Sequence, residues 1–425
     1  MQTQCNAEQL EFSCIERRRV VAAFDGGTVS SEAGALLLGR TDEAIGLIDR
    51  LAGCFIDERD PDLIGHAVRT LIGQRVFGMA LGYEDLNDHE SLRHDAVFGT
   101  LLGKLEPKRR SDCAALAGKS TLNRLELHEV QGSSRYHKIR PDGAAIERLW
   151  VDLFLEAHRE IPSEIILDLD ATDDPLHGHQ EGRFFHGYYD GYCYLPLYIF
   201  VGEHLLCAKL RRANIDGAAG AREENAVDYV FGLAKNVRLV RSLGAELIEA
   251  KSESQATQRP ARRFKELVYR TRKSWCRARR VVAKAEQTGD KANPRFIVTS
   301  LSINEWAARA LYEDFYCARG ECENRIKEAQ LDLFADRLSA ATFRANQLPL
   351  WLASAAYVLM HALRRVGLAG TALARACANT IRLRLLKIGA VVTVSVRRVN
   401  LAMSEACANQ REFIAAFHNL GAAAR

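Results

Sequence analysis

The spacing of apolar residues predicts helices over the first third of the chain. Residues 30–53 begin with serines suited to a helix N-terminus and repeat apolar side chains at helical intervals. Residues 60–82 show the same pattern. A polar connector at 131–143 follows, and one more helix is expected to run to about Glu160. The pattern therefore predicts a helical N-terminal region over residues 1–160.

The pattern changes over residues 161–365. The short run 165–170 is rich in Ile and Leu and lies between polar residues, which predicts a buried strand. Two apolar runs around a Gly-Glu pair predict a hairpin over 192–212. Further strands are expected within 227–235 and 295–302.

Helical spacing returns over 304–365, and the Ala-rich residues 366–425 predict a helical C-terminal tail. The expected fold class is therefore an α/β core inside a mostly helical protein. Several enzyme classes use such a fold, so the fold alone does not decide function.

Composition narrows the class of protein. The chain has 425 residues, 48% of them hydrophobic and 26% charged, which is the balance of a folded, water-soluble protein of two or three domains. It has no apolar run of membrane-spanning length and no signal-peptide pattern at its start. The 11 cysteines lack regular spacing, which favours free thiols in a reducing compartment. We expect a cytoplasmic location.

Positive charge is concentrated in one run, although the net charge of +4 is mild. The run Arg259–Lys284 contains eleven Lys or Arg residues and one acid, Glu266. It also contains Phe264, Tyr269 and Trp275. Basic residues beside aromatic ones are typical of contact with a nucleic-acid backbone. A solvated helix face is the alternative interpretation.

Two aspartates follow the apolar residues of the predicted strand. Side chains alternate along a strand, so Asp168 and Asp170 project on the same side. Paired carboxylates can hold Mg²⁺; alternatively, they face water beside Asp173 and Asp174. A zinc site is the weaker alternative, because neither His-x3-His nor CxxC accompanies the nearby histidines, which are His177, His179 and His186.

A second acidic feature lies in the later helical region. On a helix Tyr316, Arg319 and Glu323 stand at positions i, i+3 and i+7 and share one face, which Ile326 and Gln330 extend. A carboxylate beside a guanidinium can hold a metal and a phosphate together. An ordinary surface ion pair is the alternative.

These motifs resemble those of a known family. Tyr-x2-Arg-x3-Glu resembles the signature of bacterial insertion-sequence transposases of the DDE type, which have an RNase H-like core, and Asp170-Ala171-Thr172 resembles their Asp-x-Thr motif. The resemblance extends from Phe24 to about Arg365. Other stretches fit one subgroup of these proteins: FDGGTVSSEAGALLL, RVFGMALGYEDLNDHESLRHD, KSTLNRLE, DPLHGHQEG and ENRIKEAQLDLFADR.

The resemblance implies a catalytic domain at 161–365 with a basic insertion at about 235–303. It makes Asp170 and Glu323 catalytic ligands of Mg²⁺, or of Mn²⁺, close enough to share a cation. Tyr316 and Arg319 are expected to contact DNA phosphate near the scissile bond. The family often has Lys at the position of Gln330.

The implied function is metal-dependent cleavage and strand transfer at the element's terminal inverted repeats. The expected partners are double-stranded DNA, both the inverted repeats and the target, and a second copy of the chain in a homodimer on DNA. No membrane is involved, and a DNA-bound protein would lie at the bacterial nucleoid. The helical N-terminal region is expected to bind DNA.

The middle catalytic aspartate, however, is missing. The family carries it in a motif resembling Arg-x-Asp-Ser-x-Phe, which this sequence lacks. Only fourteen residues, 213–226, separate Arg212 from Val227, whereas a helix, a strand and a second helix need roughly 30–40. An in-frame deletion near Ala221–Arg222 explains both observations.

The remaining candidates for the middle carboxylate are poor. Asp216 lies in a Gly-rich turn and Asp228 opens the next predicted strand, so neither has the expected setting. We therefore expect impaired catalysis. The alternative functions are an inactive DNA-binding remnant and an unrelated metal-dependent nuclease.

Overall fold

The computed structural model describes residues 9–106, 114–127, 137–215, 227–272, 275 and 277–423. The chain divides into two compact units. The first unit comprises Met1–Gly217 and Arg325–Arg425, and the second comprises Ala218–Asn324. The three domains expected from the sequence are functional divisions, and their boundaries stay a prediction.

The first unit begins largely with helices, as the apolar spacing predicted. The longer ones are α1 (Leu36–Ile45), α2 (Leu47–Gly53), α3 (Val68–Ala80) and α7 (Gly143–Glu156). The helix expected over 30–53 is divided, because Gly46 has a left-handed backbone with φ of 63° and ends α1. Shorter helical segments connect them: η1 (Ala33–Ala35), η2 (Pro61–Leu63), η3 (Leu86–Asp88), α4 (His89–Leu92), α5 (Ala96–Leu101) and α6 (Lys119–Glu126).

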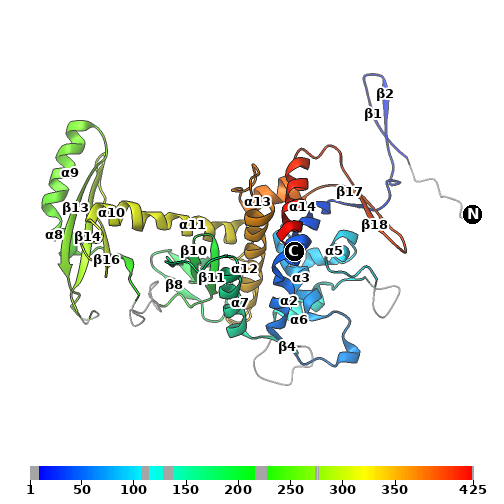
Figure 1. Cartoon of the computed structure of the whole chain (residues 1–425), viewed down its shortest axis with the longest axis horizontal. Helices are drawn as coiled ribbons and strands as arrows, with labels where there is room; N and C mark the ends of the chain where they lie inside the picture. Colours follow the sequence, from blue (N-terminus) through cyan, green and yellow to red (C-terminus); the bar gives the residue numbers. More distant parts are fainter. Residues whose placement is uncertain are drawn as a thin grey trace, which may run out of the picture. The chain divides into compact units, whose positions relative to one another are not determined.

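One apolar helix lies at the centre of this unit. Nearly every residue of α12 (Gln347–Ala362) is buried, as expected of a helix that is apolar on all sides. It contacts α3 and strand β11 (His204–Lys209), which flank it in Figure 1. Fully buried Phe77, Trp150 and Tyr357 contribute to this core. The helix continues as η8 (Leu363–Gly367).

A three-stranded antiparallel sheet carries the acidic strand. Its order is β11–β10–β6, with β6 at Asp168–Ala171 and β10 at Leu197–Val201. The hairpin predicted over 192–212 is confirmed by β10 and β11, which are joined at Gly202, where φ is 56°.

The prediction of a buried strand beginning at Ile165 was wrong in part. The strand begins only at Asp168, and the side chains of Ile165, Ile166 and Leu167 are 46%, 47% and 44% exposed. An apolar run is buried only if neighbouring elements cover it. Within the described part of the chain β6 has one strand neighbour, β10.

Smaller strands complete the N-terminal part of the first unit. A second three-stranded sheet has the order β7 (Asp174–Pro175), β9 (Gly191–Tyr194) and β8 (Phe184–His186). Strand β4 (Phe55–Asp57) pairs with β5 (Ile139–Pro141), and β1 (Leu10–Ile15) with β2 (Arg18–Ala22).

The prediction of a helical C-terminal tail was wrong in part, because the tail also contains two strands. Its helical segments are α13 (Ala378–Ile381), η9 (Arg382–Leu386) and α14 (Gln410–Ala423). Between them β17 (Ala390–Val394) and β18 (Val399–Met403) form a hairpin, and β17 also pairs with β3 (Val29–Ser30). The β-branched side chains of β17 favour a strand there despite the Ala-rich surroundings.

The second unit is built on a sheet with the strand order β12–β16–β14–β13, and the short β15 (Lys291–Ala292) pairs with β14. The predicted strands within 227–235 and 295–302 are confirmed as β12 (Val230–Leu233) and β16 (Arg295–Thr299). The basic run forms the hairpin of β13 (Ala261–Tyr269) and β14 (Arg279–Thr288). The alternative of a solvated helix face was therefore wrong.

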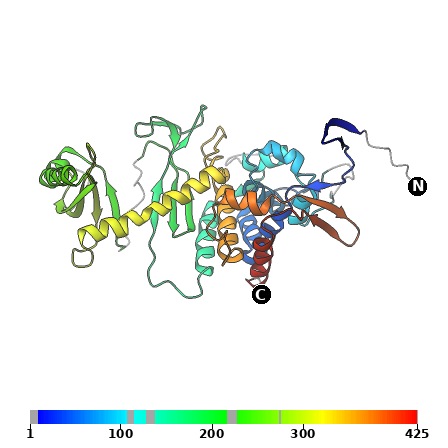
Figure 2. The ribbon, with the colours of Figure 1, turned by 90° about the horizontal axis from the view of Figure 1, so that it is seen from above.

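Helices cover both faces of this sheet (Figure 2). On one face α8 (Val237–Ser242) and α9 (Gly244–Thr257) pack over Val281, Ala283 and Ala285. On the other face Leu311 and Tyr312 pack over alternate strand residues. Both residues lie in η5 (Leu311–Tyr316), one of a series of consecutive helical segments. The others are α10 (Ala308–Ala310), η6 (Cys317–Arg319), α11 (Gly320–Lys327) and, within the first unit, η7 (Glu328–Asp332).

Two expectations from composition concern thiols and membranes. The cysteines of the described ranges are free thiols, as the sequence predicted: Cys14, Cys54, Cys193, Cys207, Cys317, Cys322, Cys377 and Cys407. Of the helices in those ranges, none has both the length and the apolar character needed to cross a membrane.

Candidate active site and nucleic-acid interface

The two aspartates of β6 lie on one face of the sheet. Asp170 pairs with Tyr198 and Asp168 with Phe200, which are alternate residues of β10, so the predicted alternation is present. Both aspartates are half-buried. The Asp170 Oδ1 accepts a hydrogen bond from the Ala171 N–H at 3.0 Å. The pair thus stands at a partly accessible sheet edge.

A buried polar cluster follows β6 directly. Asp174 is fully buried, and its Oδ1 accepts a hydrogen bond of 2.8 Å from Gln330 Nε2, which also donates to the Asp173 carbonyl at 3.2 Å. Asp174 Oδ2, the Tyr198 hydroxyl and Asp336 Oδ1 are also buried and make no hydrogen bond within the described part of the chain. Burial raises the pKa of the Asp174 carboxyl well above its usual range, and the charges of Asp336 and Asp173 add to the effect.

Asp174→Asn is expected to change how stability depends on pH. Because folding raises this pKa above its ordinary value of 3.8, the protonated carboxyl contributes stability that is complete below about pH 4. That stability is lost as the pH rises through the folded-state pKa. Asparagine cannot ionise and keeps the acceptor for Gln330, so the variant should gain stability over the parent from pH 4 to pH 8. Urea denaturation across this range measures the difference; exposed Asp152→Asn is the control, and parallel curves for Asp174→Asn and the parent would contradict the prediction.

The side chains of Tyr316, Arg319 and Glu323 contact one another in sequence along their helical segments. Arg319 Nη2 lies 3.4 Å from Glu323 Oε1, and its guanidinium carbon lies 5.5 Å from the centre of the Tyr316 ring. The shared helix face expected from their spacing is present. The Tyr316 hydroxyl lies against β12, where a Cβ on Gly232 would approach it to 2.7 Å. Glu323 remains 51% exposed.

A complete metal site is not present within the described ranges, where no three His, Cys, Asp or Glu residues are placed to hold an ion. The predicted zinc alternative therefore gains no support: His179 Nδ1 lies 2.9 Å from Arg183 Nη2, and the His186 ring contacts Tyr189. Asp170 and Glu323 belong to different units, so the prediction that they share a cation stays a prediction.

Of the two candidate substitutes for the middle aspartate, Asp228 lies within the described residues and Asp216 does not. Asp228 is exposed, precedes β12, and accepts a hydrogen bond of 2.9 Å from the Ser300 hydroxyl. Asp216 lies outside the described residues, as do Ala221 and Arg222. A catalytic role for either aspartate remains a prediction.

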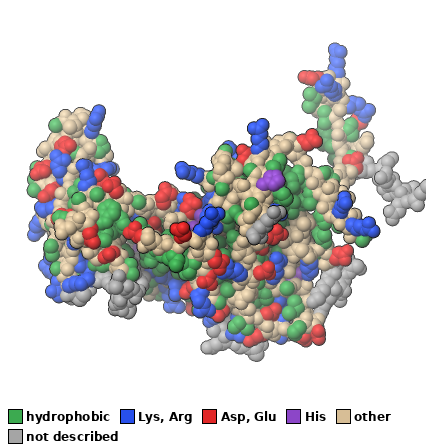
Figure 3. All heavy atoms as spheres, in the orientation of Figure 1, with side chains coloured by type: hydrophobic (Ala, Val, Ile, Leu, Met, Phe, Trp, Pro, Cys, Tyr) green, Lys and Arg blue, Asp and Glu red, His purple; other side chains and the backbone are tan. Residues whose placement is uncertain are grey.

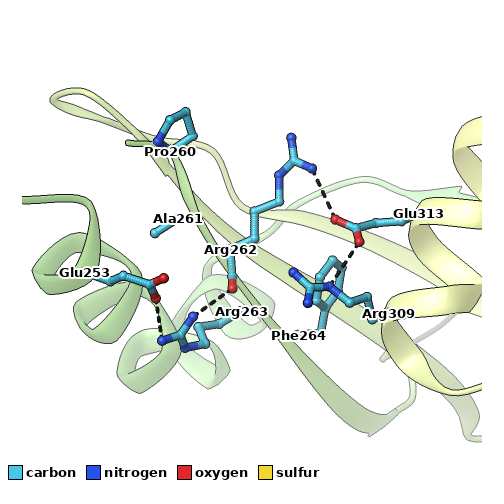
Figure 4. Close-up of a pocket in the computed structure, with 8 residues that line it drawn as sticks. All are labelled: Glu253, Pro260, Ala261, Arg262, Arg263, Phe264, Arg309 and Glu313. Atoms are coloured by element: carbon cyan, nitrogen blue, oxygen red, sulfur yellow. Dashed lines mark hydrogen bonds and ion pairs between the residues drawn. The ribbon is translucent and has the colours of Figure 1, made fainter. Parts of the chain in front are cut away.

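Much of the charge in the basic run is already neutralised. Arg262 lies 2.6 Å from Glu286 and 3.1 Å from Glu313, which also pairs with Arg309 at 3.0 Å. Of these residues, Arg262, Arg309 and Glu313 line an open groove of about 650 Å³ (Figure 4). Acidic and basic side chains are intermixed on the face of this unit that Figure 3 shows. The ion pairs therefore connect the sheet to the helical segment that begins at α10.

Arg280 makes a similar connection. Its guanidinium pairs with Glu266 at 2.6 Å and donates to the carbonyls of Leu301, Ser302 and Trp306 at 2.7–3.0 Å. Among the described residues of the run, the exposed basic ones near the hairpin tip are Arg270, Arg272 and Arg277.

Sequence reasoning missed the contacts that anchor residues 325–332. Their partners are 36 to 156 residues away in the sequence, so no local pattern reveals them. The contacts are Arg325 with Glu203, Glu328 with Arg364, and Gln330 with Asp174.

The α/β fold, the aspartates of β6 and the Tyr–Arg–Glu helix face fit the class of DNA-processing proteins that the sequence motifs resemble. The sequence pattern of the family described as "Transposase DDE domain group 1" matches residues 12–224 and 221–424. The chain therefore belongs to this transposase family, whose members act on DNA and generally use a divalent metal. None of the curated proteins matches it.

Proposed function

We propose that the chain is an insertion-sequence transposase by descent, which binds the element's terminal inverted repeats but has lost the middle aspartate of its RNase H-like catalytic core. Metal-dependent DNA cleavage and strand transfer is the ancestral reaction. The family match, which runs from residue 12 to residue 424, is the observation that carries the proposal.

The form of the match supports the loss of a segment. The family pattern matches two stretches, and the first ends where the second begins, at 221–224. At this place the sequence has only fourteen residues, 213–226, whereas the family resemblance implies a helix, a strand and a second helix. One deletion accounts for the missing motif, the short connection and the divided match.

Asp170 and Glu323 are the two catalytic carboxylates that remain in this proposal. Carboxylate oxygens are the ligands that Mg²⁺ and Mn²⁺ prefer, and the bound metals activate the nucleophile and stabilise the leaving oxygen. Gln330, two helical turns beyond Glu323, bonds to Asp173 and Asp174 just beyond Asp170. That contact lies within the first unit, and the assignment of Asp170 and Glu323 to one site rests on the family resemblance.

Tyr316 and Arg319 are proposed to contact phosphate beside that site. Arg319 already interacts with both Tyr316 and Glu323, and a guanidinium can hold a phosphate through two parallel hydrogen bonds. Tyr316 and Arg319 would then hold the scissile phosphate of the DNA next to Glu323.

The two alternative functions are not equally supported. A DNA-binding remnant without catalysis follows directly if the deletion abolishes cleavage, and such a protein would occupy the element's ends and compete with an intact transposase. An unrelated metal-dependent nuclease gains no support, because the family match includes the N-terminal region and the tail as well as the acidic motifs.

Binding to duplex DNA from the element's ends should weaken steeply as salt rises. Each phosphate neutralised by Lys or Arg releases counterions, so the logarithm of the binding constant falls by about 0.9 per contact for each tenfold rise in salt. Arg270→Ala, Arg272→Ala and Arg277→Ala together should reduce that slope by about 2–3. Fluorescence anisotropy at several salt concentrations measures it.

The matched control removes the same charge elsewhere on the second unit, through Lys235→Ala, Lys251→Ala and Lys291→Ala, all at exposed positions. The control should keep most of the parental slope. Equal slopes for the two triple variants would remove the hairpin tip from the DNA interface. Binding that is insensitive to salt, or no stronger for the inverted repeats than for unrelated DNA, would overturn the proposed function.

A further inference from the structure

The hairpin of β8 and β9 carries a cluster of exposed aromatic side chains. Phe184, Phe185, Tyr188 and Tyr192 are 36%, 55%, 85% and 48% exposed. Residues 183–192 contain no Val, Leu, Ile or Met. A contiguous exposed patch of large apolar side chains marks a binding surface, and this one consists of flat rings. The described ranges contain three other aromatic residues with this degree of exposure, which are Phe12, Phe24 and Phe417.

Two of the rings form a pair across the strands. Phe185 and Tyr192 lie directly opposite each other on β8 and β9, with ring centres 5.6 Å apart and ring planes at 77°. Arg183 is two residues before Phe185 and lies on the same face; its guanidinium carbon is 4.5 Å from the centre of the Tyr192 ring. Tyr188 lies in the turn between the strands, where the Tyr189 ring meets it at 90°. The surface therefore combines exposed rings with a guanidinium, which are the groups that hold bases and the backbone of single-stranded nucleic acid.

The inner side of this hairpin is attached to the strand that carries Asp170. The Tyr189 hydroxyl donates a hydrogen bond of 3.5 Å to the Ala171 carbonyl, and both residues pack against buried Cys193. Burial, and after it the charges of Asp173 and Asp170, raise the pKa of Tyr189 to about 12. All of these residues belong to the first unit. The aromatic surface is therefore held beside Asp170 by contacts within one compact unit.

We propose that the β8–β9 hairpin binds a short single-stranded stretch of DNA by stacking unpaired bases on Phe185, Tyr188 and Tyr192. The proposal rests on the proposed function, because the family's action on DNA makes DNA the expected ligand beside Asp170. In a duplex each base is covered by its neighbours above and below, so only unpaired bases offer free ring faces. Every base has such a face, so binding tolerates any sequence.

The test compares two labelled oligonucleotides by fluorescence anisotropy with the full chain. Both have about ten nucleotides, a length within the usual range of such sites. One is single-stranded thymidine DNA, and the other has the same phosphates with abasic sites throughout. We expect the thymidine strand to bind about tenfold more tightly or better, because it alone offers bases to stack.

Tyr188→Ala and Phe185→Ala should each weaken binding of the thymidine strand about tenfold, the effect of losing one stacked base, and leave abasic binding unchanged. Tyr188→Phe keeps the ring and should bind like the parent. Phe24→Ala is the matched control, because Phe24 is 95% exposed and lies outside the hairpin. It should leave both affinities unchanged.

Three results would overturn the proposal. One is equal binding of the two oligonucleotides by the parent. Another is an equal loss in Tyr188→Ala and Phe24→Ala. The third is a parental dimer in sedimentation that Tyr188→Ala dissociates, which would make a second copy of the chain the occupant of this surface.

Duplex DNA carrying the inverted repeats tests the proposed function separately. Binding to the repeats without a preference for the thymidine strand would overturn the role of the hairpin alone. A preference for the thymidine strand without binding to the repeats would leave the hairpin surface in place and overturn the proposed function.

Discussion

With Mg²⁺ or Mn²⁺ and a duplex carrying the element's inverted repeat, the chain as it stands is expected to leave the DNA uncut. Two metal ions must activate the attacking hydroxyl and stabilise the leaving oxygen, and each needs carboxylate ligands. Asp170 and Glu323 alone leave the second ion without a bridging ligand. Each lost effect is worth several kcal/mol, and about 1.4 kcal/mol corresponds to a tenfold change in rate. The loss should therefore amount to many orders of magnitude.

A version of the chain with the segment rebuilt from an intact relative is the positive comparison. It should nick the same duplex, and Asp170→Asn or Glu323→Gln in the rebuilt chain should abolish nicking. Asp314→Asn, which changes an exposed carboxylate on η5, is the matched control and should leave nicking intact. Denaturing gels of end-labelled DNA resolve the products.

A particular result would identify a substitute ligand instead. Cleavage by the unrepaired chain that disappears on changing Asp228 or Asp216 would show that one of them completes the site. Asp228 is exposed and its contact with Ser300 is a single hydroxyl hydrogen bond, so a metal could displace that contact. Cleavage by the rebuilt chain alone identifies the deletion as the lesion.

The sequence predicted elements best where their signals are local. The hairpin of β10 and β11 follows from two apolar runs around Gly202, and the face shared by Tyr316, Arg319 and Glu323 follows from helical spacing alone. Local signals failed where burial depends on distant elements. Ile165–Leu167 has the composition of a buried strand, yet composition cannot reveal that these side chains are 44–47% exposed, since exposure depends on which distant elements pack against them.

The basic run shows a further limit. Its charge density predicted contact with phosphate, but charge along a sequence does not show which acids lie opposite. Glu246 and Glu313 come from other elements and pair with Lys265 and Arg262, whereas Glu286 lies on β14 itself and pairs with Arg262 and Lys284. The exposed basic residues in the described part of the run are Arg259, Arg262, Arg270, Arg272 and Arg277, and of these Arg262 forms ion pairs with Glu286 and Glu313.

Arg364→Met should destabilise the first unit by about 3–5 kcal/mol, because it leaves a buried carboxylate without its counter-ion. The side chains of Arg364 and Glu328 are only 4% and 5% exposed and form two hydrogen bonds. Glu328 also accepts from the Ala378 N–H at 2.6 Å. The pair connects η7 to η8, the continuation of the central helix α12.

Replacing both partners distinguishes the contribution of the ion pair to stability from the contribution of side-chain packing. Glu328→Gln together with Arg364→Met removes both charges and keeps an acceptor for the Ala378 N–H, so much of the loss should be recovered. Hydrogen exchange in α12 (Gln347–Ala362) measures the opening free energy of this unit directly. Arg337→Met is the matched control, because Arg337 is 65% exposed and its pair with Glu84, at 3.3 Å, should contribute less than about 1 kcal/mol. A double variant as unstable as Arg364→Met alone would show that lost packing, and not the uncompensated Glu328 charge, causes the destabilisation.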